Sequence, residues 1–188
     1  MEKIMLQDFT RPAFEEYLEK NPDVVCLLTM GSMEQHGPHL PLGTDTYSVL
    51  ATCKEVARRT GCFVVLPCWP GFSPHHMGFK GTLTLTAETL QKIYLEVIGS
   101  LSHHGVKRFI IVNGHGGNVP FIPYIVLKAK RDYGVTVVNS RSFSVRARPV
   151  TKEERDAMVV RAAALSYHAG PGETGKVLVN YPELVEMD

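Results

Sequence analysis

The chain has 188 residues, with 20 lysine and arginine residues against 19 aspartate and glutamate residues, which gives a formal net charge of +1. Apolar residues make up 44% and charged residues 21%, as in a soluble globular protein with one core. The balanced charge gives no reason to expect nucleic acid or an anionic membrane as a partner, and no apolar run approaches the length that crosses a bilayer.

The N-terminal segment lacks the basic and then apolar order of a signal peptide, so the sequence predicts a cytoplasmic protein. The cysteines form no C-x-x-C pair, and Cys26 and Cys62 lie in apolar runs. We therefore expect reduced thiols that act as small hydrophobic side chains. The eight histidines are more informative, because several lie in glycine- and proline-rich loops, where functional residues concentrate.

The first half of the chain alternates strands and helices. Residues 24–30 are a continuous apolar run of strand length, and residues 46–60 have the pattern of a helix that Gly61 ends. Residues 62–66 predict a second buried strand. After a long loop, residues 86–104 predict a helix with Thr at its N-cap.

The second half continues this alternation. Residues 109–112 predict a third strand, residues 120–133 a helix and residues 135–138 a fourth strand. Residues 151–154 have a capping-box pattern, which predicts a helix that extends to Leu165. A short helix is expected near residues 173–179.

Apolar strands that alternate with helices predict an α/β fold with a mostly parallel sheet covered on both faces. No linker, repeat or low-complexity stretch divides the chain, so residues 1–188 are expected to form a single domain. Ligands bind beyond the carboxyl ends of the strands in such sheets. The loops after the first and third strands are therefore expected to meet, and both are rich in histidine.

The loop at residues 31–45 offers two carboxylates and two imidazoles in a backbone interrupted by glycine and proline. Glu34 and His36 are two residues apart, so they point to the same side of an extended segment. Asp45 just before a helix can turn back towards them. Mixed imidazole and carboxylate ligands suit Zn²⁺, Mn²⁺ or Fe²⁺. The alternatives are an N-cap role for Asp45 and a solvated surface Glu-x-His.

Two further loops have the same character. Glycines on both sides of His115 in the loop at residues 113–118 let the backbone approach closely, although an anion-binding turn is the alternative interpretation. The third loop places His168 and Glu173 at a loop-to-helix junction, where Glu173 could instead be a favourable first-turn charge. Together the three loops favour a metal centre.

These loops contain the motifs G-S-x-E-Q-H-G-P-H-L-P-L-x-T-D, N-G-H-G-G-N and H-A-G-x-x-E-T. Together they resemble the creatininase (creatinine amidohydrolase) family, from the first strand to Glu173. The resemblance implies a three-layer α/β/α sandwich with a creatininase-like sheet, and usually a homohexamer. It also implies two divalent metal ions per subunit, zinc paired with zinc, manganese or iron.

Carried onto this sequence, the family pattern makes Glu34 and His115 ligands of one ion. His36 and a glutamate would hold the other ion, and Asp45 would bridge both. His168 matches the family's catalytic histidine.

Three departures from the family pattern matter. Gly116 and Gly117 stand where enzymes that act on creatinine carry a glutamate, so Glu173 is the expected fifth ligand and is counted with the catalytic residues. Gly175 replaces a common serine. Family members usually continue well beyond Asp188, so part of the substrate pocket is expected to be absent, shorter or supplied by a neighbouring subunit.

The expected reaction is hydrolysis of a cyclic amide or other C–N bond in a small polar molecule, because two bridged ions activate a water and polarise a carbonyl. His168 would protonate the leaving nitrogen. The same site could instead hydrolyse a formamide, a terminal peptide residue or a carbocyclic ketone. The residues are also compatible with a mononuclear lyase or isomerase that uses Asp45 as base, and with a non-catalytic metal-stabilised module. Substrate contacts are expected from His75, His76, Phe79, Lys80, Gly116, Gly117 and Asn118. For the first four of these, the alternative is an exposed loop with incidental polar residues.

Overall fold

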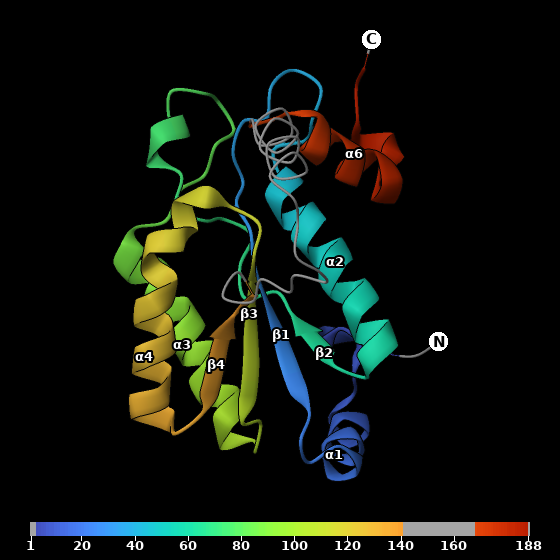
Figure 1. The fold of residues 1–188 in the computed structure, drawn as a ribbon, viewed down its shortest axis with the longest axis vertical. Coiled ribbons are helices and arrows are strands. Elements are labelled where there is room, and N and C mark those ends of the chain that lie inside the picture. The colour runs from blue at the N-terminus through green and yellow to red at the C-terminus, as the bar shows by residue number, and fades with distance from the viewer. Residues whose placement is uncertain (1–2, 141–167, 188) are drawn as a thin grey trace, which may run out of the picture.

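A computed structural model describes residues 3–140 and 168–187 of the chain. Its centre is a sheet of four parallel strands in the order β2-β1-β3-β4 (Figure 1). The strands are β1 (Val25–Met30), β2 (Phe63–Val65), β3 (Arg108–Asn113) and β4 (Thr136–Asn139). The predicted parallel α/β sheet is therefore confirmed.

Five α-helices surround this sheet in the described part of the chain. They are α1 (Arg11–Lys20), α2 (Thr44–Thr60), α3 (Ala87–His103), α4 (Ile122–Tyr133) and α6 (Pro171–Asn180). Short 3-10 turns occupy Leu6–Asp8, Pro74–His76, Gly116–Phe121 and Pro182–Leu184. None of the described helices is long and apolar enough to cross a membrane.

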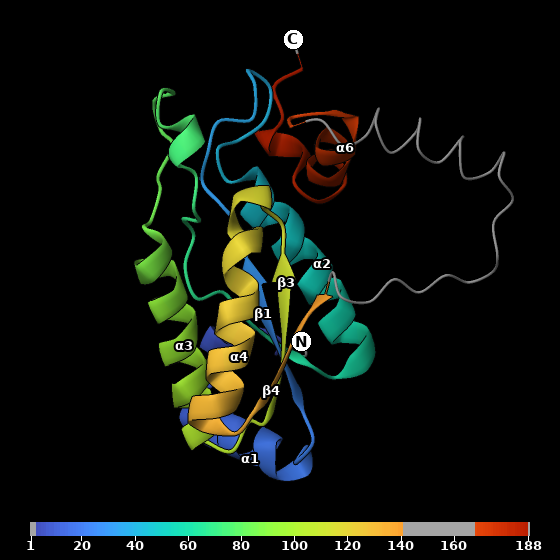
Figure 2. The same cartoon turned by 60° about the vertical axis from the view of Figure 1, so that its left-hand side comes forward.

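The helices cover both faces of the sheet, which makes the three layers that the sequence predicts. Alternate side chains of a strand point to opposite faces. Leu28 of β1 packs with Tyr94 of α3 in the core under α3 and α4, whereas Leu27 packs with Val49 in the core under α2. Figure 1 and Figure 2 show α3 and α4 together on one face and α2 on the other.

Several predicted helix ends are confirmed. Thr86 caps α3 by accepting a hydrogen bond from the Thr89 amide at 3.2 Å. Gly61 and Gly134 end α2 and α4 in the left-handed conformation, with φ of 72° and 64°. The predicted helix at residues 151–165 lies outside the described residues.

Helix α1 is absent from the sequence-based prediction. Its apolar side chains are few and only half-buried, so its periodicity is weak. The helix is held by long-range contacts, since the ring of Phe14 lies 5.3 Å from that of Phe63 and Tyr17 donates a hydrogen bond to the Gly61 carbonyl at 2.5 Å. A pattern within ten residues does not contain this information.

All four cysteines are free thiols, as expected. Cys26 and Cys53 are buried, whereas Cys62 and Cys68 are half-buried. Burial raises the pKa of Cys53 to about 12 and that of Cys68 to about 11, so both stay protonated and unreactive at neutral pH.

The connections of two neighbouring strands diverge at the middle of the sheet. β1 pairs with β3 from Val25 with Arg108 to Met30 with Asn113, so both strands end together. The chain leaves β1 towards α2 on one face and leaves β3 towards α4 on the other. Such a divergence leaves a crevice beyond the carboxyl ends of the strands, where ligands of α/β sheets bind.

Gly31, at the end of β1, leaves no space for a side chain. A Cβ atom there would lie 2.2 Å from Thr46 Oγ1 and 2.5 Å from Thr46 Cα. We expect Gly31→Ala to lower the free energy of unfolding by about 3 kcal/mol. Thermal unfolding should show a midpoint roughly 6–12 °C lower.

The matched control for this prediction is Gly78→Ala, because no atom lies within 4 Å of a Cβ at that position. This variant should unfold with the wild type, within about 0.5 kcal/mol. An unchanged midpoint in Gly31→Ala would show that α2 does not pack against the end of β1 in this way.

Candidate metal centre

The loop after β1 carries Glu34 and His36 into the crevice. The Glu34 amide donates to the Leu42 carbonyl at 2.9 Å, which closes the loop on itself. Both side chains are buried, with exposed fractions of 1% and 0%. His36 Nδ1 lies 3.0 Å from the Glu34 carbonyl oxygen, which fixes this nitrogen as the donor and leaves Nε2 free to bind.

Asp45 lies in the first turn of α2 and does not cap this helix, whose N-cap is Gly43. Its two carboxylate oxygens face two different imidazoles. Oδ1 lies 3.3 Å from His36 Nε2, and Oδ2 lies 3.0 Å from His115 Nδ1. The N-cap interpretation of Asp45 is therefore wrong, and the side chain lies between the loops that follow β1 and β3.

His115 enters the site from the loop after β3. Its Nε2 lies 3.0 Å from the Phe72 carbonyl oxygen and 3.3 Å from Ser73 Oγ, so this nitrogen carries the proton that the carbonyl accepts. Nδ1 then faces Asp45 and Glu34. Gly117 is required here, because a Cβ atom would lie 2.2 Å from the Phe72 oxygen.

Glu173 and His168 come from the C-terminal part of the chain. Glu173 Oε2 lies 3.8 Å from His36 Nε2 and accepts a hydrogen bond from the Ala169 amide at 2.6 Å. His168 Nε2 lies 2.5 Å from the Gln35 carbonyl oxygen, and its Nδ1 lies 3.7 Å from Glu34 Oε1. Ala169 between them has a φ of 55°, which turns the chain tightly enough for both side chains to enter.

Helix α6, which carries Glu173, is fastened to the loop after β1. His39 Nε2 lies 2.9 Å from Thr174 Oγ1, and the Glu186 amide donates to the His39 carbonyl at 2.9 Å. Figure 1 and Figure 2 both show α6 at the end of the sheet where α2 begins. The three loops that the sequence singles out therefore meet at one site.

The donor set fits divalent metal ions. Potential ligand atoms lie within 4.8 Å of one another in the groups Glu34–His75–His115, Glu34–His36–His168 and His36–Asp45–Glu173. His36 Nε2 and Asp45 Oδ2 are buried and make no hydrogen bond with the residues that the structure describes. Buried polar atoms rarely lack a hydrogen-bond partner, so both atoms are available to bind a ligand.

The close packing of buried carboxylates and imidazoles shifts the pKa values of the site. Burial opposes ionisation of Glu34, but hydrogen bonds from His115 and Ser73, together with the charge of the nearby imidazoles, outweigh it and lower the pKa to about 2. Burial also opposes charge on His115, but Asp45 and Glu34 outweigh it and raise its pKa to about 10. Burial raises the pKa of Asp45, but the contacts with His115 and His36 outweigh burial, so the pKa is lowered. The site therefore attracts positive charge.

Four of the five expected metal ligands, Glu34, Asp45, His115 and Glu173, line a cavity of about 500 Å³. Of the expected substrate-binding residues, His75, His76, Gly116 and Gly117 line it. Phe79 and Lys80 are exposed and do not line it.

Asn118, another expected substrate contact, is fully buried. It connects three loops, since its side-chain nitrogen donates to the Gly31 carbonyl at 2.8 Å and its side-chain oxygen accepts from the backbone amide of Phe72 at 3.0 Å.

Two polar residues near the site escaped the sequence-based prediction. Ser73 Oγ lies 2.5 Å from Ser32 Oγ and 3.3 Å from His115 Nε2. The Gln35 side-chain nitrogen lies 3.1 Å from His76 Nδ1. Gln35 belongs to the motif around Glu34 and His36, but only the fold brings its side chain and that of Ser73 to the imidazoles.

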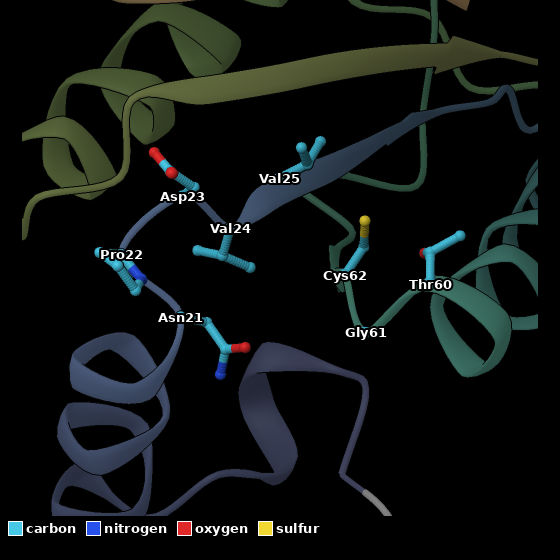
Figure 3. Close-up of a pocket in the computed structure, with 8 residues that line it drawn as sticks. All are labelled: Asn21, Pro22, Asp23, Val24, Val25, Thr60, Gly61 and Cys62. Atoms are coloured by element: carbon cyan, nitrogen blue, oxygen red, sulfur yellow. The ribbon is translucent and has the colours of Figure 1, made fainter.

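A second cavity, of about 320 Å³, lies at the opposite end of the sheet (Figure 3). Its lining offers one carboxylate, Asp23, and one thiol, Cys62. Asp23 already pairs with Arg108, with 2.8 Å between Oδ1 and Nη1. This cavity cannot assemble a metal centre of mixed imidazoles and carboxylates.

A three-layer α/β fold with a cluster of potential metal ligands at the strand ends is typical of metal-dependent α/β enzymes. Comparison with known proteins gives the family. The model of the creatininase (creatinine amidohydrolase) family matches residues 7–188. The chain belongs to this family.

The chain is 30% identical over 189 residues to 3-dehydro-scyllo-inosose hydrolase of Thermotoga maritima, and the alignment covers 98% of this chain and 58% of that protein. It is also 30% identical to creatinine amidohydrolase of Pseudomonas putida, over 88% of this chain and 68% of that protein. A solved structure of a manganese form of creatininase superposes with a TM-score of 0.79 at 27% identity, over 98% of this chain and 76% of the other. The chain thus spans about three fifths to two thirds of these two relatives.

Protein stripped of metal by a chelator should lose stability at both alkaline and acid pH. The pKa of His115 rises from 6.5 to about 10 on folding, so its contribution is complete below pH 6.5 and is lost as the pH rises towards 10. The pKa of Glu34 falls from 4.5 to about 2, so its contribution is complete above pH 4.5 and is lost as the pH falls towards 2. We expect the urea midpoint of stripped protein to be highest between these limits and to fall by about pH 9.

The control is His115→Gln, in which the alkaline loss attributed to His115 should disappear. A stripped wild-type protein whose midpoint does not change from neutral to alkaline pH would contradict the pairing of His115 with the two carboxylates.

Proposed function

We propose that this protein is a binuclear metal-dependent hydrolase that cleaves a cyclic amide or other C–N bond of a small polar molecule. The observation that carries the proposal is the position of Asp45, whose two oxygens face the free nitrogens of His36 and His115. One carboxylate between two imidazoles is suited to bridging two ions. A single ion would use only one of the two pairs that an Asp45 oxygen forms with an imidazole nitrogen.

The five donors divide between two ions around Asp45. Glu34 and His115 would hold one, and His36 and Glu173 the other, with zinc paired with zinc, manganese or iron. The donors are mixed nitrogen and oxygen, which suits these metals. Ions held there would supply an activated water and would polarise the substrate carbonyl. Solved zinc and manganese forms of creatininase support this choice of metals.

His168 is placed to move a proton at the cavity wall. The Gln35 carbonyl accepts the Nε2 proton, so Nδ1 faces Glu34 Oε1 at 3.7 Å and the cavity. The side chain is 34% exposed, so it can reach a substrate that binds above the metal ligands. With its own proton on Nε2, the imidazole can take a proton from the attacking water at Nδ1 and then give it to the leaving nitrogen as the C–N bond breaks.

The open cavity disfavours a purely structural metal site, because structural sites have closed coordination. Similarity to the 3-dehydro-scyllo-inosose hydrolase of Thermotoga maritima supports a second candidate substrate class. Hydrolysis of a carbocyclic ketone on the same site is therefore the alternative to C–N cleavage. A screen of cyclic amides, formamides and cyclic ketones with metal-loaded protein would separate the two.

Asp45→Ala tests the bridging role. Removing both oxygens should empty or severely weaken both metal sites, because each ion loses one ligand and a shared charge. Metal analysis after gel filtration should give about two ions per chain for the wild type and well under one for the variant. Asp132→Ala, which removes a carboxylate on α4, should keep both ions. Two tightly bound ions in Asp45→Ala would refute the bridging assignment.

His168→Ala tests the separation of proton transfer from metal binding. The variant should retain its metal, while turnover falls about 10²–10⁴-fold, the usual contribution of a general acid or base. His103→Ala, at the exposed end of α3, is the matched control and should leave turnover unchanged. Loss of metal from His168→Ala would make His168 a ligand instead.

We also propose that the protein is a cytoplasmic homo-oligomer, a hexamer by resemblance to its family. The loop beside the cavity exposes Met77 by 53% and Phe79 by 57%, apolar surface that a neighbouring subunit can cover. Light scattering at micromolar concentration should give a mass several times that of one chain. A fully active monomer would contradict this assembly.

A further inference from the structure

A smaller cavity, of about 190 Å³, lies against the metal centre between α2, β3 and α6. It shares three lining residues with the larger cavity, namely Asp45, Gly114 and Glu173. A molecule bound at the metal-binding carboxylates therefore has a second compartment within reach. The chemistry of that compartment differs from that of the first.

Lys176 supplies a permanent positive charge to the smaller cavity. Among the described residues that line the two cavities, it is the only lysine or arginine. It follows Glu173 by three residues on α6, so both side chains lie on the same side of that helix. Lys176 is exposed and makes no ion pair with any residue in the described part of the chain.

Ser48 supplies an unused hydroxyl group in the same wall. Its Oγ is buried and has no hydrogen-bond partner among the residues described. It lies one turn after Asp45 on α2, and the neighbouring Thr52 hydroxyl already donates to the Ser48 carbonyl at 3.0 Å. A buried hydroxyl without a partner is rare and costs stability, so it marks a place where an acceptor can bind.

The other polar side chains that line the smaller cavity are engaged or belong to the proposed metal ligands. Asp45 Oδ1 and Glu173 Oε2 lie 3.3 and 3.8 Å from His36 Nε2, and ions held by these carboxylates would offset their negative charge. The Asn113 amide bonds to the backbone of His115, and the Thr52 hydroxyl donates to the Ser48 carbonyl. The ammonium group of Lys176 and the hydroxyl of Ser48 are left to donate, and two donors suit an anion.

We propose that the smaller cavity is a subsite for a carboxylate on the substrate, held by Lys176 and Ser48 while the scissile bond lies at the metal centre. This proposal rests on the proposed function, and it narrows the substrate class to small amides that carry a carboxylate. One singly charged lysine and a cavity of 190 Å³ match a carboxylate.

The test compares two ligands that share a metal-binding group. Acetohydroxamate is neutral beyond its hydroxamate, whereas succinate monohydroxamate adds a carboxylate on a short chain. Calorimetric titration of zinc-loaded wild-type protein at low ionic strength should show the second ligand binding about threefold to fivefold more tightly, the effect of one partly exposed ion pair. The difference should shrink at about 1 M salt, where exposed charges are screened.

Variants assign that difference to particular side chains. Lys176→Gln and Ser48→Ala should each reduce the preference for succinate monohydroxamate and leave acetohydroxamate binding unchanged. Lys176→Arg should keep most of the preference. Lys130→Gln, which removes a charge from the end of α4, should behave as the wild type.

Two failures are distinguishable. Equal affinity of the wild type for both ligands, or a preference that persists in both Lys176→Gln and Ser48→Ala, would overturn the subsite while the metal centre stands. Failure of acetohydroxamate to bind would overturn the metal centre on which the subsite depends.

Discussion

Burial of negative charge at the end of the sheet is the constraint on which the site depends. Glu34 is 1% and Asp45 4% exposed, and burial by itself raises the pKa of both carboxyl groups. His36 and His115 offset this cost, yet His36 Nε2 and Asp45 Oδ2 still lack hydrogen-bond partners among the described residues. Such an arrangement is stable when further positive charge lies between the groups, which is what divalent ions provide.

A small number of backbone and side-chain contacts position these carboxylates and imidazoles. Pairing of Met30 with Asn113 aligns the ends of β1 and β3, so the two loops begin side by side. Gly114 then lets the second loop approach α2, since a Cβ there would lie 2.7 Å from the Asp45 carbonyl oxygen. The hydrogen bond between His39 and Thr174 brings α6 to the same place. Aligned strand ends, and loops held by hydrogen bonds, give the precision that a metal centre needs.

The sequence predicts much of this arrangement, because strand and helix periods are local and the three histidine-rich loops follow particular elements. The parallel sheet, its two-sided cover and the N-cap at Thr86 follow from such patterns. Features made by tertiary contact do not. Helix α1 packs against Phe63, and the smaller cavity lined by Ser48 and Lys176 exists only because α6 folds back onto α2. The family resemblance assigns the metal ligands and says nothing of these contacts.

The central claim is that Asp45 joins two metal ions, and anomalous diffraction from crystals of the metal-loaded protein tests it most directly. The account predicts two anomalous peaks, one beside each oxygen of Asp45 at about 2.0–2.2 Å, with His36 and His115 on different ions. A single peak, or two peaks of which neither contacts Asp45, would contradict it.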